Sequence, residues 1–370
     1  MMKNYFDRFY EAALAYIFRI PKPALKLIGG GVMLLLAASA GFVFQLSGTT
    51  KSGPFSIRVD TSSSTPMCVT IILLLMGVVM IGAGIRLAMR QQRHDDAVRS
   101  RKRALVIETR GLRDGPGSPL EPSVPANIIG QRESRMLDLR QMYDGEIMFP
   151  ERGLEKVAMI PSMIEQAAGD MDRRDFSIVY GGLAPVPYTF LAGILIDDEG
   201  GSITTMDWDR NALRWRELDE ADDGKRFVEE GISDQALGNE VVLAVSVSYQ
   251  IVQANLDSKF GDLPKVRMML QDGHPNAHWS EAKQAALADQ FFKMLIKLEG
   301  LGIKRINLVL AAQASLVFRF GRIYDKKNLP ALTVWQFDPK YAPPYPWGIA
   351  MPVRGQEKAS LERELHSEAA

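Results

Sequence analysis

Two long uncharged segments near the amino terminus constrain the fold of this chain more than any other feature. Residues 27–46 form a run of twenty residues without a charged side chain, and residues 67–85 form a second run of nineteen. A helix rises 1.5 Å per residue, so about 20 apolar residues cross the roughly 30 Å hydrocarbon layer of a bilayer. The sequence therefore predicts two membrane-spanning helices within residues 25–90.

The first segment has an alternative interpretation as a cleaved signal peptide. Ala38-Ser39-Ala40 resembles a small-residue cleavage site. The apolar run continues past that site through residues 42–44, which makes it longer than the hydrophobic region of a signal peptide. We therefore favour a membrane anchor.

The distribution of basic residues predicts the orientation of the two spans. The loop between them, residues 47–66, carries only Lys51 and Arg58. The flanks are far more basic, with Lys3, Arg8, Arg19, Lys22 and Lys26 before the first span and Arg86, Arg90, Arg93, Arg99, Arg101, Lys102 and Arg103 after the second. Because basic flanks stay on the cytoplasmic side, both termini are expected in the cytoplasm, and the basic linker at 91–103 would face anionic headgroups.

Residues 1–24 are predicted to form an amphipathic segment at the membrane surface. Apolar side chains recur at helical spacing within residues 5–18, with charged residues elsewhere on the helix. A helix that packs against the soluble part of the chain would show the same pattern, and the sequence does not separate the two.

From residue 104 onward the sequence predicts an α/β fold with mainly parallel sheets, because short apolar strands alternate with helix-length segments. The predicted strands are 104–107, 177–180, 203–206, 241–247, 306–310 and 332–335, and the predicted helices are 151–168, 185–195, 281–298 and 315–324. Residues 113–135 are expected to form a loop and residues 353–370 a tail.

Two of these strand–helix units match each other. Residues 176–184 align with 306–314 without a gap, so that Val179 falls on Val309, Tyr188 on Phe318 and Phe190 on Phe320. The soluble part is therefore predicted to be a duplication, with halves at 104–230 and 236–352 related by pseudo-twofold symmetry.

Catalytic and metal-binding motifs are not evident in the sequence. His274 and His278 have a spacing that metal ligands use on a helix, but Pro275 interrupts that helix. We therefore expect no enzyme activity, no metal and no cofactor. Lys plus Arg equal Asp plus Glu at 44 each, so no direct binding of DNA or RNA is expected either.

The turns that follow the matched strands are the candidate ligand site. Small residues at the carboxyl end of a parallel strand let a ligand approach the backbone, and the next helix offers free N–H groups. Tight packing of helix on sheet also demands small residues, and this alternative carries equal weight. In the proposed site Arg110 supplies a cation and Tyr249 or Trp215 a stacking surface. The full set is Thr109, Arg110, Gly181, Gly182, Trp215, Ser246, Ser248, Tyr249, Gln313 and Ser315.

The carboxyl-terminal half resembles the SAVED domain family. The resemblance rests on residues 306–324, on Leu332-Thr-Val-Trp-Gln-Phe-Asp338, and on Tyr341. The turn Ala-Ala-Gln-Ala-Ser departs from the more common Ala-Ala-Pro-Ala. The resemblance covers 236–352 well and 104–230 more loosely. It implies two fused CARF-like, Rossmann-like halves that sense a cyclic oligonucleotide made by a nucleotidyltransferase in bacterial CBASS systems.

A two-span amino terminus joined to such a domain is similar to the membrane-disrupting CBASS effectors. The resemblance implies an inner-membrane protein that binds a cyclic oligonucleotide, with a trinucleotide as the expected size. Binding would drive homo-oligomerisation, membrane disruption and abortive infection. Two alternatives remain open: a membrane-tethered sensor or enzyme for another nucleotide or metabolite, and a scaffold without a ligand.

Overall fold

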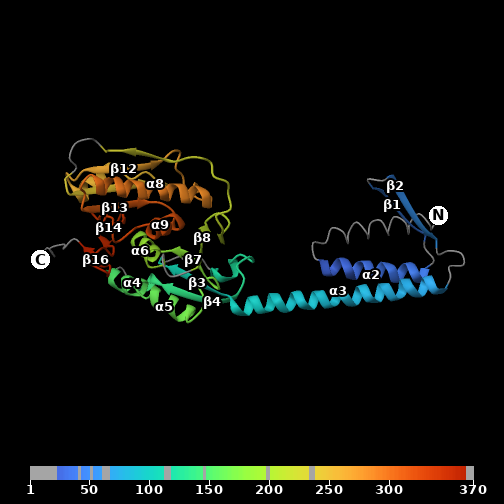
Figure 1. The fold of residues 1–370 in the computed structure, drawn as a ribbon. Coiled ribbons are helices and arrows are strands. Elements are labelled where there is room, and N and C mark those ends of the chain that lie inside the picture. The colour runs from blue at the N-terminus through green and yellow to red at the C-terminus, as the bar shows by residue number, and fades with distance from the viewer. Residues whose placement is uncertain are drawn as a thin grey trace. The chain divides into compact units, whose positions relative to one another are not determined.

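The computed structural model describes residues 23–40, 43–50, 53–60, 67–111, 118–144, 147–196, 201–232 and 238–363 (Figure 1). The chain divides into two compact units, residues 1–99 and 100–370. Of the predicted amphipathic segment at 1–24, only residues 23 and 24 lie within the described ranges.

The first unit contains two helices and a hairpin. Helix α2 spans Pro23–Ala40, strands β1 (Val43–Thr50) and β2 (Gly53–Asp60) pair antiparallel, and helix α3 spans Met67–Arg101. The predicted helix over 27–46 is therefore wrong at its end, because residues 43–46 belong to β1. A glycine at 41 and the sequence Phe-Val-Phe at 42–44 favour a strand over a helix. The hairpin also occupies part of the loop predicted at 47–66.

Helix α3 has the length and composition of a membrane span. Among the described residues it is the one helix that meets both criteria, over Cys68–Ala97, whereas the apolar part described in α2 is shorter. Helix α3 continues to Arg101, so most of the residues predicted as a basic linker are helical.

Glycines bring the backbones of α2 and α3 into contact. A Cβ atom placed on Gly31 would lie 2.6 Å from the carbonyl oxygen of Gly77, and one on Gly84 would lie 2.9 Å from that of Ala24. Small residues permit this close approach where lipid supplies no hydrophobic drive between helices. The two helices therefore form a tightly packed pair.

The first sheet of the second unit has the strand order β4-β3-β7-β8-β9. The first four strands are parallel and β9 is antiparallel. The strands are β3 (Arg103–Arg110), β4 (Gln131–Asp138), β7 (Phe176–Leu183), β8 (Ser202–Asp209) and β9 (Arg214–Arg216), with helices α4 (Pro150–Val157), α5 (Ile160–Ala168) and α6 (Val186–Ile196), the 3-10 helices η1 (Glu121–Ser123) and η2 (Leu139–Met142), and the short hairpin β5 (Tyr143–Asp144) and β6 (Ile147–Met148).

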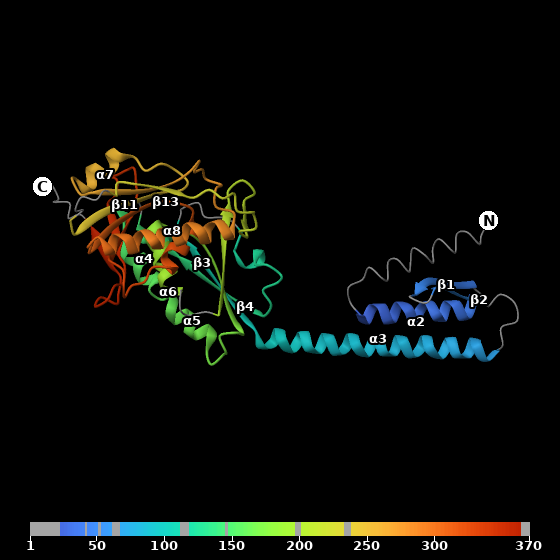
Figure 2. The same cartoon turned by 45° about the horizontal axis from the view of Figure 1, so that its top comes forward.

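The second sheet has the order β10-β12-β11-β13-β14-β15-β16. Its strands are β10 (Phe227–Glu230), β11 (Glu240–Ser246), β12 (Lys265–Leu270), β13 (Arg305–Ala311), β14 (Ala331–Gln336), β15 (Trp347–Ala350) and β16 (Ser360–Arg363). Helices α7 (Gln253–Phe260) and α8 (Glu281–Gly300) cover its two faces (Figure 2), and helix α9 (Ala314–Arg322) follows β13.

The strand orders confirm the duplication. The order is β4-β3-β7-β8-β9 in the first half and β12-β11-β13-β14-β15 in the second. Each of these sets has four parallel strands and one antiparallel strand. The equivalent helices α6 and α9 pack on each other (Figure 1). A Cβ on Gly193 of α6 would lie 2.2 Å from the carbonyl oxygen of Phe318, and one on Gly321 of α9 would lie 2.0 Å from that of Phe190.

Several predicted boundaries are wrong for local reasons. The loop expected at 113–135 contains η1 and the start of β4, whose polar sequence Gln-Arg-Glu-Ser-Arg lies at a sheet edge and gives no apolar signal. The helix expected at 151–168 is two helices, with a proline at 161 near the break. The tail expected at 353–370 contains β16, which pairs with β15.

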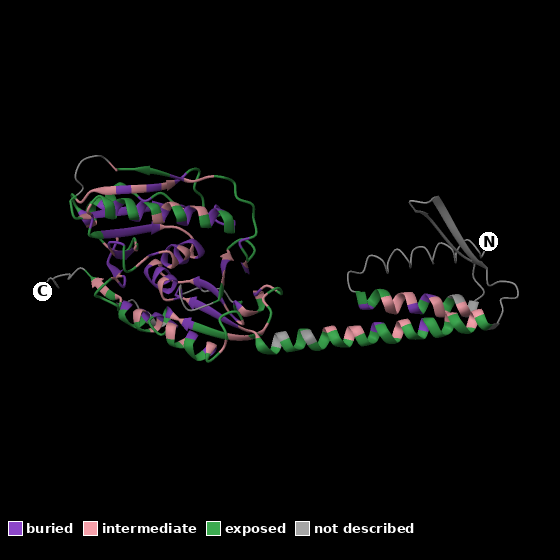
Figure 3. Cartoon of the chain, viewed as in Figure 1, coloured by how far each residue is buried: buried purple, intermediate pink, exposed green. Residues whose placement is uncertain are grey.

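The buried side chains of the second unit concentrate on its strands and on the helices between the sheets (Figure 3). Tyr180 of the first sheet stacks on Phe318 of α9 with ring centroids 3.9 Å apart. The two halves thus share one core, which fixes the position of each sheet's carboxyl edge.

Candidate functional site

A cavity of about 520 Å³ lies at the carboxyl ends of strands from both halves. Its walls come from the last residues of β7, β8, β13 and β14, from residues that follow these strands and β11, and from the segment 275–279 that precedes α8. Ligands of open α/β sheets bind in the crevice outside the carboxyl ends of the strands. The volume lies within the range of small-molecule sites, about 300–1,000 Å³.

Helices α6 and α9 both begin at this cavity, and each is capped by the other half. The Ser315 N–H donates to Oδ2 of Asp207 at 3.0 Å, and the Val186 N–H donates to Oε1 of Gln336 at 3.1 Å. Asp207 lies on β8 and Gln336 ends β14, so the two caps are related by the pseudo-twofold symmetry. The Ser315 N–H that we expected to bind an anion is therefore already used by a carboxylate.

A buried histidine lies beside the Asp207 cap. The Nε2 atom of His278 is 3.4 Å from Oδ2 of Asp207, and both side chains are almost fully buried. Burial lowers the pKa of His278, and the charge of Asp207 opposes this effect without reversing it. The imidazole is therefore held neutral at the cavity wall.

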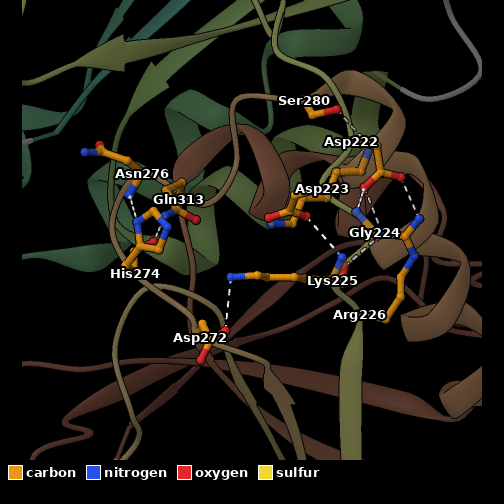
Figure 4. A network of polar contacts seen from close by, with 11 residues as sticks. Asp222, Asp223, Gly224, Lys225, Arg226, Asp272, His274, Asn276, Ser280 and Gln313 are labelled. Atoms are coloured by element: carbon orange, nitrogen blue, oxygen red, sulfur yellow. Dashed lines mark hydrogen bonds and ion pairs between the residues drawn. The ribbon is translucent and has the colours of Figure 1, made fainter.

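Gln313 fastens the segment 274–279 to the start of α9. Its Nε2 atom donates to the carbonyl oxygen of Pro275 at 2.7 Å and to that of His274 at 3.3 Å. Figure 4 shows Gln313 beside His274. The same figure shows ion pairs next to this segment, including Lys225 with Asp272 at 3.1 Å. An ion pair with the first half, through Lys225, therefore lies next to the cavity wall.

One cation and several aromatic rings remain open toward the cavity. Among the lining residues that the structure describes, Arg210 is the only lysine or arginine. Tyr249 is 61% exposed and Phe337 is 44% exposed. The cavity therefore offers one guanidinium for a phosphate and flat surfaces on which bases stack.

Comparison with protein families identifies both units. Residues 3–154 match the family described as SAVED-fused 2TM effector domain. Residues 161–351, more than half of the chain, match the SMODS-associated and fused to various effectors sensor domain, SAVED. The chain belongs to the SAVED family. It combines this sensor domain with a membrane effector domain.

Comparison with solved structures finds Cap4 receptors. The chain is similar at 9% identity to the Cap4 SAVED/CARF-domain containing receptor of Acinetobacter baumannii with the cyclic trinucleotide 2'3'3'-cAAA, with a TM-score of 0.44, and to the receptor of Moraxella osloensis, with a TM-score of 0.39. The match to the first receptor covers 73% of this chain, and the match to the second covers 72%. In both cases this chain spans only 58% of the length of the receptor. Comparison with curated proteins finds no match.

The SAVED cavity contains three of the ten predicted site residues: Ser248, Tyr249 and Gln313. Ser246 and Ser315 lie next to it but are buried, and their side chains have internal partners. The Ser246 hydroxyl accepts from the Ile251 N–H at 3.3 Å, and the Ser315 hydroxyl accepts from Nε2 of Gln284 at 2.8 Å. These two serines stabilise the cavity edge.

The other five predicted residues lie outside the cavity of the SAVED domain. Arg110 pairs with Glu108, and Trp215 is buried, with its Nε1 donating to the Ser118 carbonyl at 3.2 Å. Thr109 hydrogen-bonds the Tyr180 hydroxyl at 3.1 Å. Neighbouring side chains fill the space beside Gly181 and Gly182, so a larger residue would not fit at either position. This agrees with the alternative that small residues serve packing. The cation and the aromatic surface that we assigned to Arg110 and Trp215 are therefore not available there.

Sequence reasoning missed Arg210, a cation that lines the cavity. It directly follows the end of β8 at Asp209. A search for basic residues shortly after the predicted strands would have found it.

Proposed function

We propose that this protein is a CBASS effector whose SAVED cavity binds a cyclic oligonucleotide and which acts without catalysis. The observation that carries the proposal is the cavity shared by both halves, in which one guanidinium lies among exposed aromatic rings. A cyclic oligonucleotide, with a trinucleotide as the expected size, has phosphates for Arg210 and bases for Tyr249 and Phe337. Stacking contributes about 1–3 kcal/mol per base.

Binding to the full-length protein in detergent tests this proposal. The probes are 2'3'3'-cAAA, 3'3'3'-cAAA and a wider panel of cyclic di- and trinucleotides, with calorimetry and thermal shift as the readouts. Arg210→Ala should weaken binding about 10- to 100-fold, because a charge-assisted hydrogen bond contributes about 1.5–3 kcal/mol.

Arg214→Ala is the matched control. This variant removes the same charge from the neighbouring strand, at a residue that does not line the cavity. Its affinity should equal that of the unaltered protein. A panel in which no cyclic nucleotide binds, or equal losses in both variants, would contradict the proposal.

The effector step proposed for the first unit is disruption of the bacterial inner membrane. Two helices cannot enclose a pore, so several copies of the α2–α3 pair must gather. We propose that ligand-bound SAVED domains associate and bring the pairs together. Reconstituted vesicles loaded with a dye should leak when a binding cyclic nucleotide is added, and vesicles containing Arg210→Ala should stay intact at the same concentration.

A further inference from the structure

One wall of the cavity contains hydrogen-bond acceptors that lack donors. Within the described part of the chain, the buried polar atoms without a partner include Oε1 of Gln313, Oε1 of Gln284 and both ring nitrogens of His278. All four atoms belong to residues in or beside the segment 274–279. A buried acceptor without a donor is costly, so the cluster calls for a partner that the free protein does not supply.

The amide of Gln313 cannot exchange its two ends. Its Nε2 atom donates to two carbonyl oxygens, those of Pro275 and His274. If the amide were flipped, its oxygen would face both of them and lose both bonds. Oε1 is therefore fixed as an acceptor beside the cavity.

Gln284 repeats this arrangement one layer deeper. Its Nε2 atom donates to the His278 carbonyl oxygen and to the Ser315 hydroxyl, both at 2.8 Å, so its Oε1 atom is also left as an acceptor. The shortage of donors therefore extends behind the wall.

His278 adds a second acceptor at the cavity surface. A neutral imidazole has one N–H donor and one lone pair. Acceptors are available for the N–H, because the Asp207 carboxylate and the Pro275 carbonyl lie near the ring. The structure shows no donor for the lone pair.

We infer that Gln313 and His278 select a ligand base that carries an exocyclic amino group. This inference rests on the proposed function and adds a base preference to it. An amino group brings two N–H donors to the unpartnered acceptors of Gln313 and His278. A base with a carbonyl oxygen at the same position would place acceptor against acceptor.

The same geometry requires the wall to move when ligand binds. The unpartnered atoms of Gln313 and His278 are enclosed in the free protein, although both residues line the cavity. A base reaches them only when the segment 274–279 shifts. Hydrogen exchange in this segment should therefore change on binding.

The test compares two purine ligands on the full-length protein in detergent. The probes are 3'3'3'-cAAA and its counterpart built from unsubstituted purine ribosides, in which hydrogen replaces each amino group and the ring nitrogens keep their lone pairs. We expect cAAA to bind at least tenfold more tightly, because each lost donor leaves an acceptor unpaired. His278→Phe, which keeps a ring against Trp279, and Gln313→Met should each reduce this ratio several-fold. Gln356→Met is the control, because Gln356 is an exposed glutamine that does not line the cavity.

Each outcome is informative. Equal affinity for the two probes would overturn the base preference and leave the proposed function standing. An unchanged ratio in both variants would show that water supplies the missing donors, and would also overturn the inference. Failure of every cyclic nucleotide to bind would instead overturn the proposed function. The affinity ratio of the two probes is measured first on the unaltered protein, so this test does not depend on whether any variant folds.

Discussion

At the residue scale, single side chains hold two distant parts of the chain together at the cavity. Asp207 accepts from the Ser315 N–H, 108 positions along the chain, and Gln336 does the same for Val186 from the other half. A carboxylate at a helix N-terminus also interacts favourably with the helix dipole. Each cap thus gives an N–H group at the start of a helix an acceptor, and it also joins the two halves.

The buried His278 predicts a dependence of stability on pH. Its pKa is lowered in the folded state, whereas an unfolded histidine titrates near 6.5. Below that pH the unfolded chain binds a proton that the folded chain excludes. The free energy of unfolding should therefore fall as the pH drops from 7.5 to 5.5, by at most about 1.4 kcal/mol per pH unit.

Urea unfolding at several pH values measures this effect. The groups around the ring are Asp207 and Glu220, which favour its protonation, and Arg216, which opposes it. The pKa of Asp222 is lowered to about 2, so that carboxylate titrates outside the tested range. His278→Phe should make the curve flatter, and an equally steep curve in this variant would assign the dependence to another group.

At the element scale, the contact between α6 and α9 fixes the two sheets relative to each other. Glycines let the helices touch backbone to backbone, because Gly193 lies against Phe318 and Gly321 against Phe190. Aromatic rings flank this contact, since Phe190 of α6 lies 6.3 Å from Tyr324, which follows α9, between ring centroids. The cavity between the halves depends on this spacing.

Gly321→Ala should therefore destabilise the second unit. Its Cβ would lie 2.0 Å from a backbone oxygen that cannot rotate away. Overpacking of this kind costs about 1–3 kcal/mol. Gly300→Ala is the control, because a Cβ there meets nothing within 4 Å and the glycine ends helix α8. Thermal unfolding in detergent measures both, and equal melting temperatures would contradict the close contact.

At the scale of the whole molecule, the proposed function requires the sensor domain and the membrane helices to act together. A ligand can shift the protein toward an assembled state only if it binds that state more tightly. A head-to-tail contact between SAVED domains that the ligand completes would meet this condition. Light scattering should then show a larger particle with saturating cyclic nucleotide, and one unchanged size would contradict the mechanism.

The orientation of the chain in the membrane has a separate test. We expect residues 47–66 outside the cell and the SAVED domain in the cytoplasm. In a Cys68→Ser background, an impermeant thiol reagent should label a cysteine at position 63 in intact spheroplasts and miss one at position 360. The reverse labelling pattern would refute the predicted orientation.

The sequence by itself determined the properties that depend on local patterns. The apolar content of residues 67–85, the alternation of strands and helices and the match of Val179 to Val309 all follow from the order of side chains along the chain. The resemblance at residues 306–338 identified the SAVED family for the same reason. The polar edge strand β4 was not predicted from the sequence, because it lacks an apolar pattern.

Only the tertiary structure decided which candidate residues meet at the cavity. Small residues after a strand are suited both to ligand approach and to helix packing. The sequence therefore made Gly181 and Gln313 equally good candidates for the ligand site. Packing within the first half fills the space at Gly181 with Leu120 and Trp215, whereas Gln313 lines the cavity. The availability of a charge likewise depends on its neighbours, since Glu108 occupies Arg110 while Arg210 lines the cavity. Such pairings join residues through space, and no local pattern encodes them.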